Sequence, residues 1–103
     1  MKRTIYEEAL DVWGEDSQIE QLIEECSELI LALQKLKRHR RFNQGQRVDR
    51  INDVLEEIAD VKIMIRQIEL IFPPEEVAKY ESIKLDRLRK RLDKYAFRNI
   101  DNC

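Results

Sequence analysis

Apolar residues recur every three or four positions in four stretches of the chain. Two of the stretches are long, residues 17–37 and 47–71, and two flank them, residues 4–12 and 74–95. This spacing places apolar side chains on one face of a helix. The chain has only 2 glycines and 2 prolines, too few for the turns of many short strands. The pattern therefore predicts an all-α protein with two long helices, a short N-terminal helix and a C-terminal helix.

Breaker residues mark the expected helix ends. Gly14, in "WGEDS", is expected to end the short helix, and Asp16 or Ser17 to cap the next one. The first long helix is expected to end near Lys37, before a loop that contains the second glycine. The pair Pro73–Pro74 should stop the second long helix and start the last one, to about Tyr95, with the tail "AFRNIDNC" frayed or docked on a partner.

The two long helices are expected to pack as antiparallel neighbours through their apolar stripes. The first stripe comprises Ile19, Leu22, Ile23, Cys26, Leu29, Ile30 and Leu33. The second comprises Ile51, Val54, Leu55, Ile58, Val61, Ile65 and Ile68. A chain of 103 residues is long enough for one domain, so we expect a single helical bundle over residues 1–103.

Each long helix carries an acidic turn beside its stripe, and the two turns have matched spacing. "EECSELI" is echoed 32 positions later by "EEIADVK". At about 100° per residue, Glu25 borders the first stripe and Glu28 lies roughly 60° further round. Glu57 and Asp60 hold the equivalent places on the second helix. Antiparallel packing brings these two edges to the same side, where the charges repel each other unless a cation lies between them.

The four carboxylates indicate a particular kind of metal. An all-oxygen set suits Mg²⁺, with Mn²⁺ as the other choice, rather than zinc. Helical di-iron sites need two Glu-x-x-His pairs, whereas the only histidine here, His39, falls in the expected loop. The alternative is that both acidic turns are solvated helix faces.

Composition narrows the function classes. The 19 basic and 21 acidic residues give a net charge of −2, so no overall field favours nucleic acid or a membrane surface. No apolar run has the length of about 18–20 residues that a membrane span needs. The N-terminus lacks the apolar core of a signal peptide. Cys26 and Cys103 are too few for a disulfide framework, and a cytoplasmic location is expected.

The second long helix is apolar on more than one side. Ile63, Met64, Leu70 and Ile71 lie off its main stripe. A helix of this kind needs burial on several sides, which predicts self-association. The alternative is a helix that is central to its own bundle.

At this point the chain resembles a known family. "WGEDSQIEQLIEECSEL" followed by "NDVLEEIADVKIMIRQIEL" is similar to the MazG-like all-α nucleoside triphosphate pyrophosphohydrolases of the short, single-domain phage and bacterial type. The resemblance implies Mg²⁺-dependent hydrolysis of a (deoxy)nucleoside triphosphate to the monophosphate and pyrophosphate. It places the metal ligands at Glu25, Glu28, Glu57 and Asp60. It also implies a homodimer or a dimer-of-dimers tetramer.

Further candidates follow for contact with the substrate. The family's last helix supplies basic residues to the phosphates, and the matching positions are Lys84, Arg87 and Arg91. A solvated basic face is the alternative for them. Two residues near the start of the first long helix are candidates for contact with the nucleobase of the substrate. Trp13 would stack on the nucleobase, and Gln18 would form hydrogen bonds with its edge. Trp13 as the anchor of a helix junction, and Gln18 as an ordinary first-turn residue, are the alternatives.

Glu24 is the candidate general base or second-layer group, because it adjoins the ligands in sequence. The alternative to an enzyme is a function of a different class. The chain would then be a non-catalytic helical oligomerisation or interaction module, with solvated acidic turns and an apolar face for a partner helix.

Overall fold

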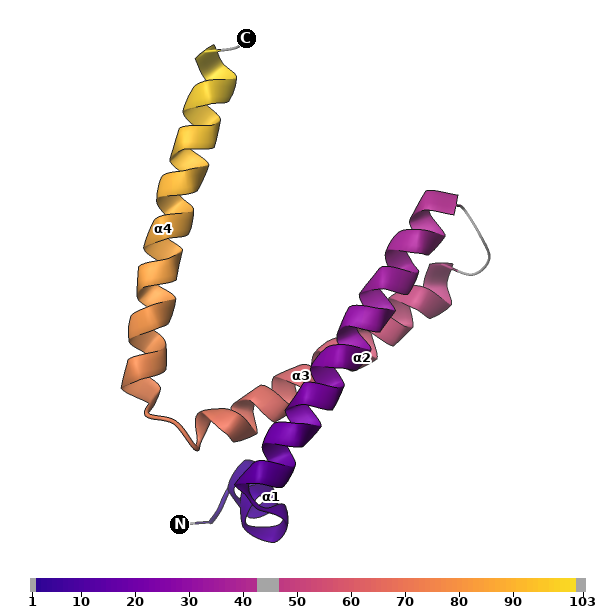
Figure 1. Ribbon diagram of the computed structural model, residues 1–103, viewed down its shortest axis with the longest axis vertical. Coiled ribbons are helices and arrows are strands. Elements are labelled where there is room, and N and C mark those ends of the chain that lie inside the picture. Colours follow the sequence, from indigo (N-terminus) through magenta and orange to yellow (C-terminus); the bar gives the residue numbers. More distant parts are fainter. Residues whose placement is uncertain (1, 43–46, 102–103) are drawn as a thin grey trace. The chain divides into compact units, whose positions relative to one another are not determined.

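The described part of the chain forms four helices (Figure 1). The computed structural model describes the backbone of residues 2–42 and 47–101 and the side chains of residues 2–39 and 48–96. The helices are α1 (Ile5–Trp13), α2 (Glu15–Phe42), α3 (Arg47–Glu69) and α4 (Pro74–Asp101). Neither described range contains a strand. The predicted all-α fold is confirmed.

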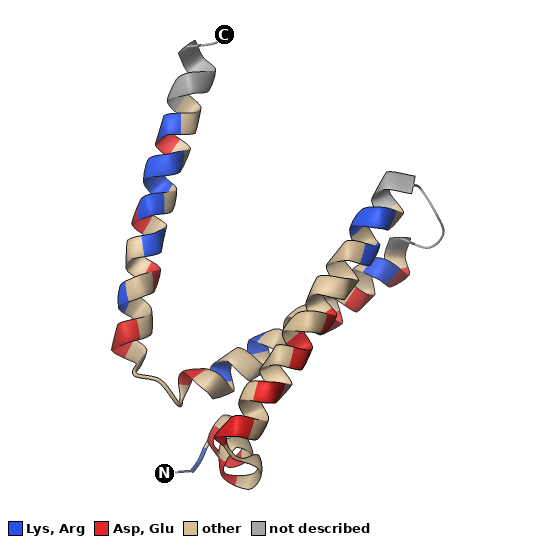
Figure 2. Ribbon diagram, viewed as in Figure 1, with Lys and Arg blue, Asp and Glu red and all other residues tan. Residues whose placement is uncertain are grey.

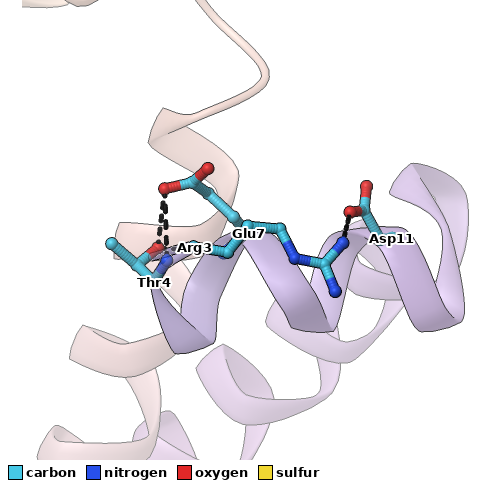
Figure 3. Close-up of polar contacts among 4 residues, drawn as sticks. All are labelled: Arg3, Thr4, Glu7 and Asp11. Carbon is cyan, nitrogen blue, oxygen red and sulfur yellow. Dashed lines mark hydrogen bonds and ion pairs between the residues drawn. The ribbon is translucent and has the colours of Figure 1, made fainter. Parts of the chain in front are cut away.

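The first helix is fixed by local hydrogen bonds. Thr4 is its N-cap: the Thr4 hydroxyl accepts from the Glu7 backbone N–H, and the Glu7 carboxylate accepts from the Thr4 N–H. This reciprocal pair satisfies two of the backbone donors that a helix start leaves free. Arg3 also pairs with Asp11 across two turns (Figure 3).

Gly14 both ends α1 and starts α2. Its φ of 87° lies in the region that favours glycine, and its N–H donates to the Leu10 carbonyl. Its own carbonyl accepts from the Gln18 N–H at 3.2 Å, the first bond of α2. The prediction that Gly14 ends the first helix is therefore right. The predicted cap at Asp16 or Ser17 is wrong, because α2 begins directly at Glu15 and both residues lie in its first turn.

Helices α2 and α3 pack side by side as an antiparallel pair, and α1 contacts both of them (Figure 1). Along both helices run covered positions that are spaced alternately by three and four residues, as in a coiled coil. On α2 they are Gln18, Leu22, Glu25, Leu29, Ala32 and Leu36. On α3 they are Val54, Glu57, Val61, Met64 and Ile68. We call these positions the α2–α3 seam.

The seam uses only part of the predicted apolar stripes. Both helices are apolar over a wider arc than a single contact can cover, and the seam selects the 3–4 spaced positions. Outside the seam, Ile19, Cys26 and Ile51 of the stripes are half-buried. The other six stripe residues are 40–60% exposed and form what we call the outer apolar face: Ile23, Ile30, Leu33, Leu55, Ile58 and Ile65. Glu25 and Glu57, expected at the border of the stripes, lie instead within the seam.

The off-stripe residues of α3 divide in a similar way. Met64 is only 6% exposed because the α2–α3 seam covers it, so its burial needs no second subunit. Ile63 and Leu70 remain about half exposed, and Ile71 is half-buried. For Met64, the inference that this side chain needs a partner is therefore wrong.

The chain forms two compact units, residues 1–71 and 72–103. The second is built on α4, which starts at Pro74 with Glu75 and Glu76 in its first turn, as predicted. The helix continues beyond Tyr95 to Asp101, since no glycine or proline interrupts it. The tail expected to fray is therefore largely helical.

The single domain over residues 1–103 stays a prediction. No helix in the described ranges has the length and apolar content to cross a membrane.

Candidate functional site

Three of the four predicted metal ligands meet across the α2–α3 seam. Glu25 and Glu28 come from consecutive turns of α2, and Glu57 comes from α3. One carboxylate oxygen of each lies within 4.8 Å of the others. The fourth, Asp60, is one turn beyond Glu57, and its charge is close enough to raise the pKa values of Glu25 and Glu57. Figure 2 shows acidic residues along the first half of α2. We call these four residues the acidic cluster.

Burial leaves two of these carboxylates with unsatisfied oxygens. Glu25 and Glu57 are half-buried. The Gln21 side-chain amide donates to Glu25 Oε1 at 2.9 Å. Glu25 Oε2 and Glu57 Oε2 are shielded from solvent and have no hydrogen-bond partner among the described residues. Removing a carboxylate oxygen from water without a partner costs free energy, and a cation would offset this cost.

The same surroundings shift the protonation of both groups. Burial is the main reason why the pKa of Glu25 is raised, and the charges of Asp60 and Glu28 add to it, while the hydrogen bond from Gln21 opposes it. The pKa of Glu57 is also raised chiefly by burial, and then by Glu28, Asp60 and Glu25. Close like charges that share a partly dry site are typical of carboxylates arranged around a metal or in an active site.

The metal-free protein should lose stability as pH rises through the raised pKa values of Glu25 and Glu57. Because both pKa values are higher in the folded state, the folded protein binds more protons than the unfolded chain above pH 4.5, the ordinary glutamate value. The free energy of unfolding therefore decreases with pH through this window and recovers on acidification. Thermal melts in EDTA at a series of pH values measure this decrease in stability. Glu57→Gln should show a shallower decrease, and equal slopes for the two proteins would contradict the coupling.

The spacing of the acidic cluster suits one or two divalent cations. Mg²⁺ sits about 2.0–2.1 Å from its ligand oxygens in octahedral geometry, which sets those oxygens roughly 3–4 Å apart. One oxygen each of Glu25, Glu28 and Glu57 lies within 4.8 Å of the others, so a small inward movement of the side chains would bring three ligands to this spacing. The donor set has only carboxylate oxygens, as Mg²⁺ and Mn²⁺ prefer. The residues present therefore fit the expected metal.

Glu24 lies outside this arrangement. It precedes Glu25 on α2, and its side chain is exposed. The group of carboxylates within 4.8 Å does not include it. Its role as a general base stays a prediction.

A pocket of about 420 Å³ lies near the acidic cluster, at the α1–α2 junction. Its lining residues are Trp13, Ser17, Gln18, Gln21, Met64 and Gln67. Trp13 and Gln18, the two residues that the sequence predicts to contact the nucleobase, are both in this lining. Gln21 joins the two features, because it lines the pocket and also donates to Glu25. The pocket and the carboxylates are therefore neighbours.

Gln67 is the lining residue that sequence reasoning missed. It is 7% exposed, Gln18 is 6% exposed, and Gln67 Oε1 has no hydrogen-bond partner among the described residues. Glutamine is rarely buried without a reason. One feature of the sequence could have identified Gln67: it is a polar residue directly before Ile68, which belongs to the apolar stripe of α3.

The basic candidates lie on α4, in the second unit. Lys84, Arg87 and Arg91 are exposed there. Figure 2 shows basic residues along much of α4. Their neighbours Arg89 and Lys90 form ion pairs four residues apart, with Asp93 at 2.8 Å and Asp86 at 3.2 Å. Among the described residues, no ion pair engages Lys84, Arg87 or Arg91. These three cations thus remain available to an anionic ligand.

The first unit thus contains a capped short helix, a pocket lined by an indole and buried amides, and a group of carboxylates of which Glu25 and Glu57 are half-buried. Comparisons of the chain with models of protein families, with curated proteins and with solved structures gave no match.

Proposed function

We propose that the chain is a MazG-like, Mg²⁺-dependent pyrophosphohydrolase that converts a nucleoside or deoxynucleoside triphosphate to the monophosphate and pyrophosphate. The observation that carries this proposal is the meeting of Glu25, Glu28 and Glu57 across the seam, with two shielded oxygens lacking partners. Two half-buried carboxylates beside a third like charge are costly for a purely structural helix pair. It is favourable when a cation binds.

The chemistry requires positioning and charge neutralisation. Hydrolysis of the α–β phosphoanhydride adds a water oxygen to phosphorus and breaks the bridging P–O bond, releasing pyrophosphate. When bound, Mg²⁺ would withdraw charge from the phosphates and lower the pKa of a water molecule. Glu25, Glu28, Glu57 and Asp60 would hold the metal. Glu24, which adjoins Glu25 in sequence and is exposed, would accept the proton of the water.

The basic side of α4 would bind the phosphates. Lys84, Arg87 and Arg91 recur at i, i+3 and i+7, so they share one side of the helix, and they have no internal ion pair among the described residues. Lysine and arginine form charge-assisted hydrogen bonds with phosphate oxygens. This part of the proposal rests on the sequence and on the absence, among the described residues, of an ion pair to these three side chains.

Self-association belongs to the same proposal. The outer apolar face has six large side chains that are 40–60% exposed, whereas only five hydrophobic side chains in the described ranges are buried. Complete burial of such a side chain contributes about 1.5–3 kcal/mol, so covering the six would contribute several kcal/mol. That is comparable with the net stability of a small domain, about 5–15 kcal/mol. A homodimer or a dimer-of-dimers tetramer would supply the cover.

The same face supports a second candidate, a non-catalytic helical interaction module. In that case the face binds a partner helix and the carboxylates bind no metal. The two candidates differ in their response to Mg²⁺, because only a metal-binding chain is stabilised by it.

A panel of NTPs and dNTPs with Mg²⁺ tests the proposal directly. We expect pyrophosphate and the matching monophosphate as products from at least one of them, identified by anion-exchange chromatography. Mg²⁺ or Mn²⁺ should also raise the melting temperature; a ligand at a hundred times its Kd contributes roughly 2.7 kcal/mol. No product from any substrate, together with identical melting with Mg²⁺ and with EDTA, would favour the interaction module.

A further inference from the structure

The pocket at the α1–α2 junction has an unmet chemical requirement. Gln67 Oε1 is shielded from solvent and accepts no hydrogen bond from any described residue. A buried acceptor that has no hydrogen-bond partner destabilises the folded state. Gln67 lines a space of about 420 Å³, so a turn of its amide towards this space would let a ligand N–H satisfy the oxygen. The requirement is therefore for a molecule that donates a hydrogen bond to Gln67.

The rest of the lining suits a flat ring. Trp13 is 63% exposed and presents an indole to the pocket edge, while Met64 is a soft apolar surface on the α3 side. Gln18 adds a second buried amide, and an amide both donates and accepts. An aromatic surface, a thioether and two amides match a heterocycle that carries adjacent donors and acceptors. A sugar, which has no aromatic face, would use this lining less well.

The position of the pocket restricts the ligand further. Gln21 lines the pocket and donates to Glu25 at 2.9 Å, so the ring site and the carboxylates share one side chain. A ligand with its ring in the pocket would therefore lie beside Glu25 of the acidic cluster. A nucleotide has this form: a planar donor–acceptor ring joined to phosphates that bind Mg²⁺.

We infer that this pocket holds the nucleobase of the substrate and that Gln67 is its specificity-determining residue, accepting a hydrogen bond from a ring or exocyclic N–H of the base. The inference rests on the proposed function for the identity of the substrate. Gln67 acts on the base alone and touches no reacting atom. It therefore sets which base is accepted rather than whether the phosphoanhydride is cleaved.

Trp13 provides a direct readout of the pocket. It is the only tryptophan in the chain, so intrinsic fluorescence excited at the indole absorption edge reports this site. The probes are uridine, thymidine, cytidine, adenosine and guanosine, titrated to millimolar concentration in EDTA. Without phosphates and metal, the titration measures base binding separately from hydrolysis. At least one nucleoside should change the Trp13 emission saturably.

Gln67→Met removes the amide and nearly keeps the side-chain volume. It should weaken binding of the preferred nucleoside by roughly tenfold to a hundredfold, the effect of one lost hydrogen bond to a buried amide. It should also level the kcat/KM values across the panel of triphosphates. Its melting temperature in EDTA should be no lower than that of the wild type, because an orphaned polar atom has been replaced by an apolar one. Gln34→Met, the same change at an exposed position of α2, is the control and should alter none of these.

Each outcome decides one point. Unchanged nucleoside binding in Gln67→Met, or no saturable change in Trp13 emission with any nucleoside, would overturn the inference. A Gln67→Met protein that melts well below the wild type in EDTA would assign Gln67 a structural role and would also overturn it. Nucleoside binding that depends on Gln67, without pyrophosphate release, would uphold the pocket and refute the proposed hydrolysis. If Gln67→Met hydrolysed triphosphates with the base selectivity of the wild type, the proposed hydrolysis would be upheld and the role of Gln67 would be refuted.

Discussion

Glu57→Gln should lower pyrophosphate release from a triphosphate by roughly two orders of magnitude or more, because it removes one of the few groups that hold the metal against the developing charge. The same substitution should leave the metal-free protein at least as stable as the wild type. Glu57 is half-buried, with one orphaned oxygen, and its pKa is raised by burial and by three nearby carboxylates. An amide in its place removes a repulsive charge. Pyrophosphate assays with Mg²⁺ and thermal melts in EDTA measure both effects.

Glu20→Gln supplies the matched control for this experiment. It makes the identical change at an exposed position of α2, outside the acidic cluster. We expect its activity and its melting temperature to follow the wild type. If Glu57→Gln kept full activity, and the wild type melted identically with Mg²⁺ and with EDTA, the metal site would be wrong and the enzyme proposal would fail with it.

Ile30→Asp should dissociate the oligomer into monomers of about 12.4 kDa. Ile30 is 57% exposed and is part of the outer apolar face. If a second copy covers that face, the new carboxylate is buried without a partner, which costs several kcal/mol and weakens association by at least a hundredfold. Sedimentation velocity at micromolar concentration measures the change. The hairpin of α2 and α3 should stay folded, because the side chain is exposed in the isolated chain.

Leu31→Asp is the control for the outer apolar face. Leu31 is 50% exposed, close to Ile30 in accessibility, but it points about 100° away around α2. It should leave the oligomer intact. A wild-type protein that sediments as a compact monomer at micromolar concentration would contradict self-association altogether.

The helices themselves were readable from the sequence, because their signals are local. Apolar spacing of three and four located all four helices, Gly14 ended the first, and Pro74 began the last. The errors were at boundaries. A single glycine proved enough to join α1 to α2, so the expected cap at Asp16 or Ser17 was not needed. The last helix ran on to Asp101 because nothing in its sequence stops it.

The acidic cluster was also predictable, and for a clear reason. Its residues lie at fixed offsets on two helices, so helical geometry and one assumption, antiparallel packing, bring Glu25, Glu28 and Glu57 together. The assumption holds for α2 and α3. Whether a metal binds there is a separate matter, which the EDTA and Mg²⁺ experiments address.

The sequence by itself determined the helices, their order and the side of the pair that carries the acids, since each depends on residues a few positions apart. Only the tertiary structure decided which of two apolar stripes is buried, because helices that are apolar over a wide arc can pair in more than one rotation. That rotation covered Met64, placed Glu25 and Glu57 within the seam, and left the outer apolar face exposed. It also brought Gln67 beside Gln18 and Trp13. Residues more than 45 positions apart meet there through packing, and no local pattern encodes that contact.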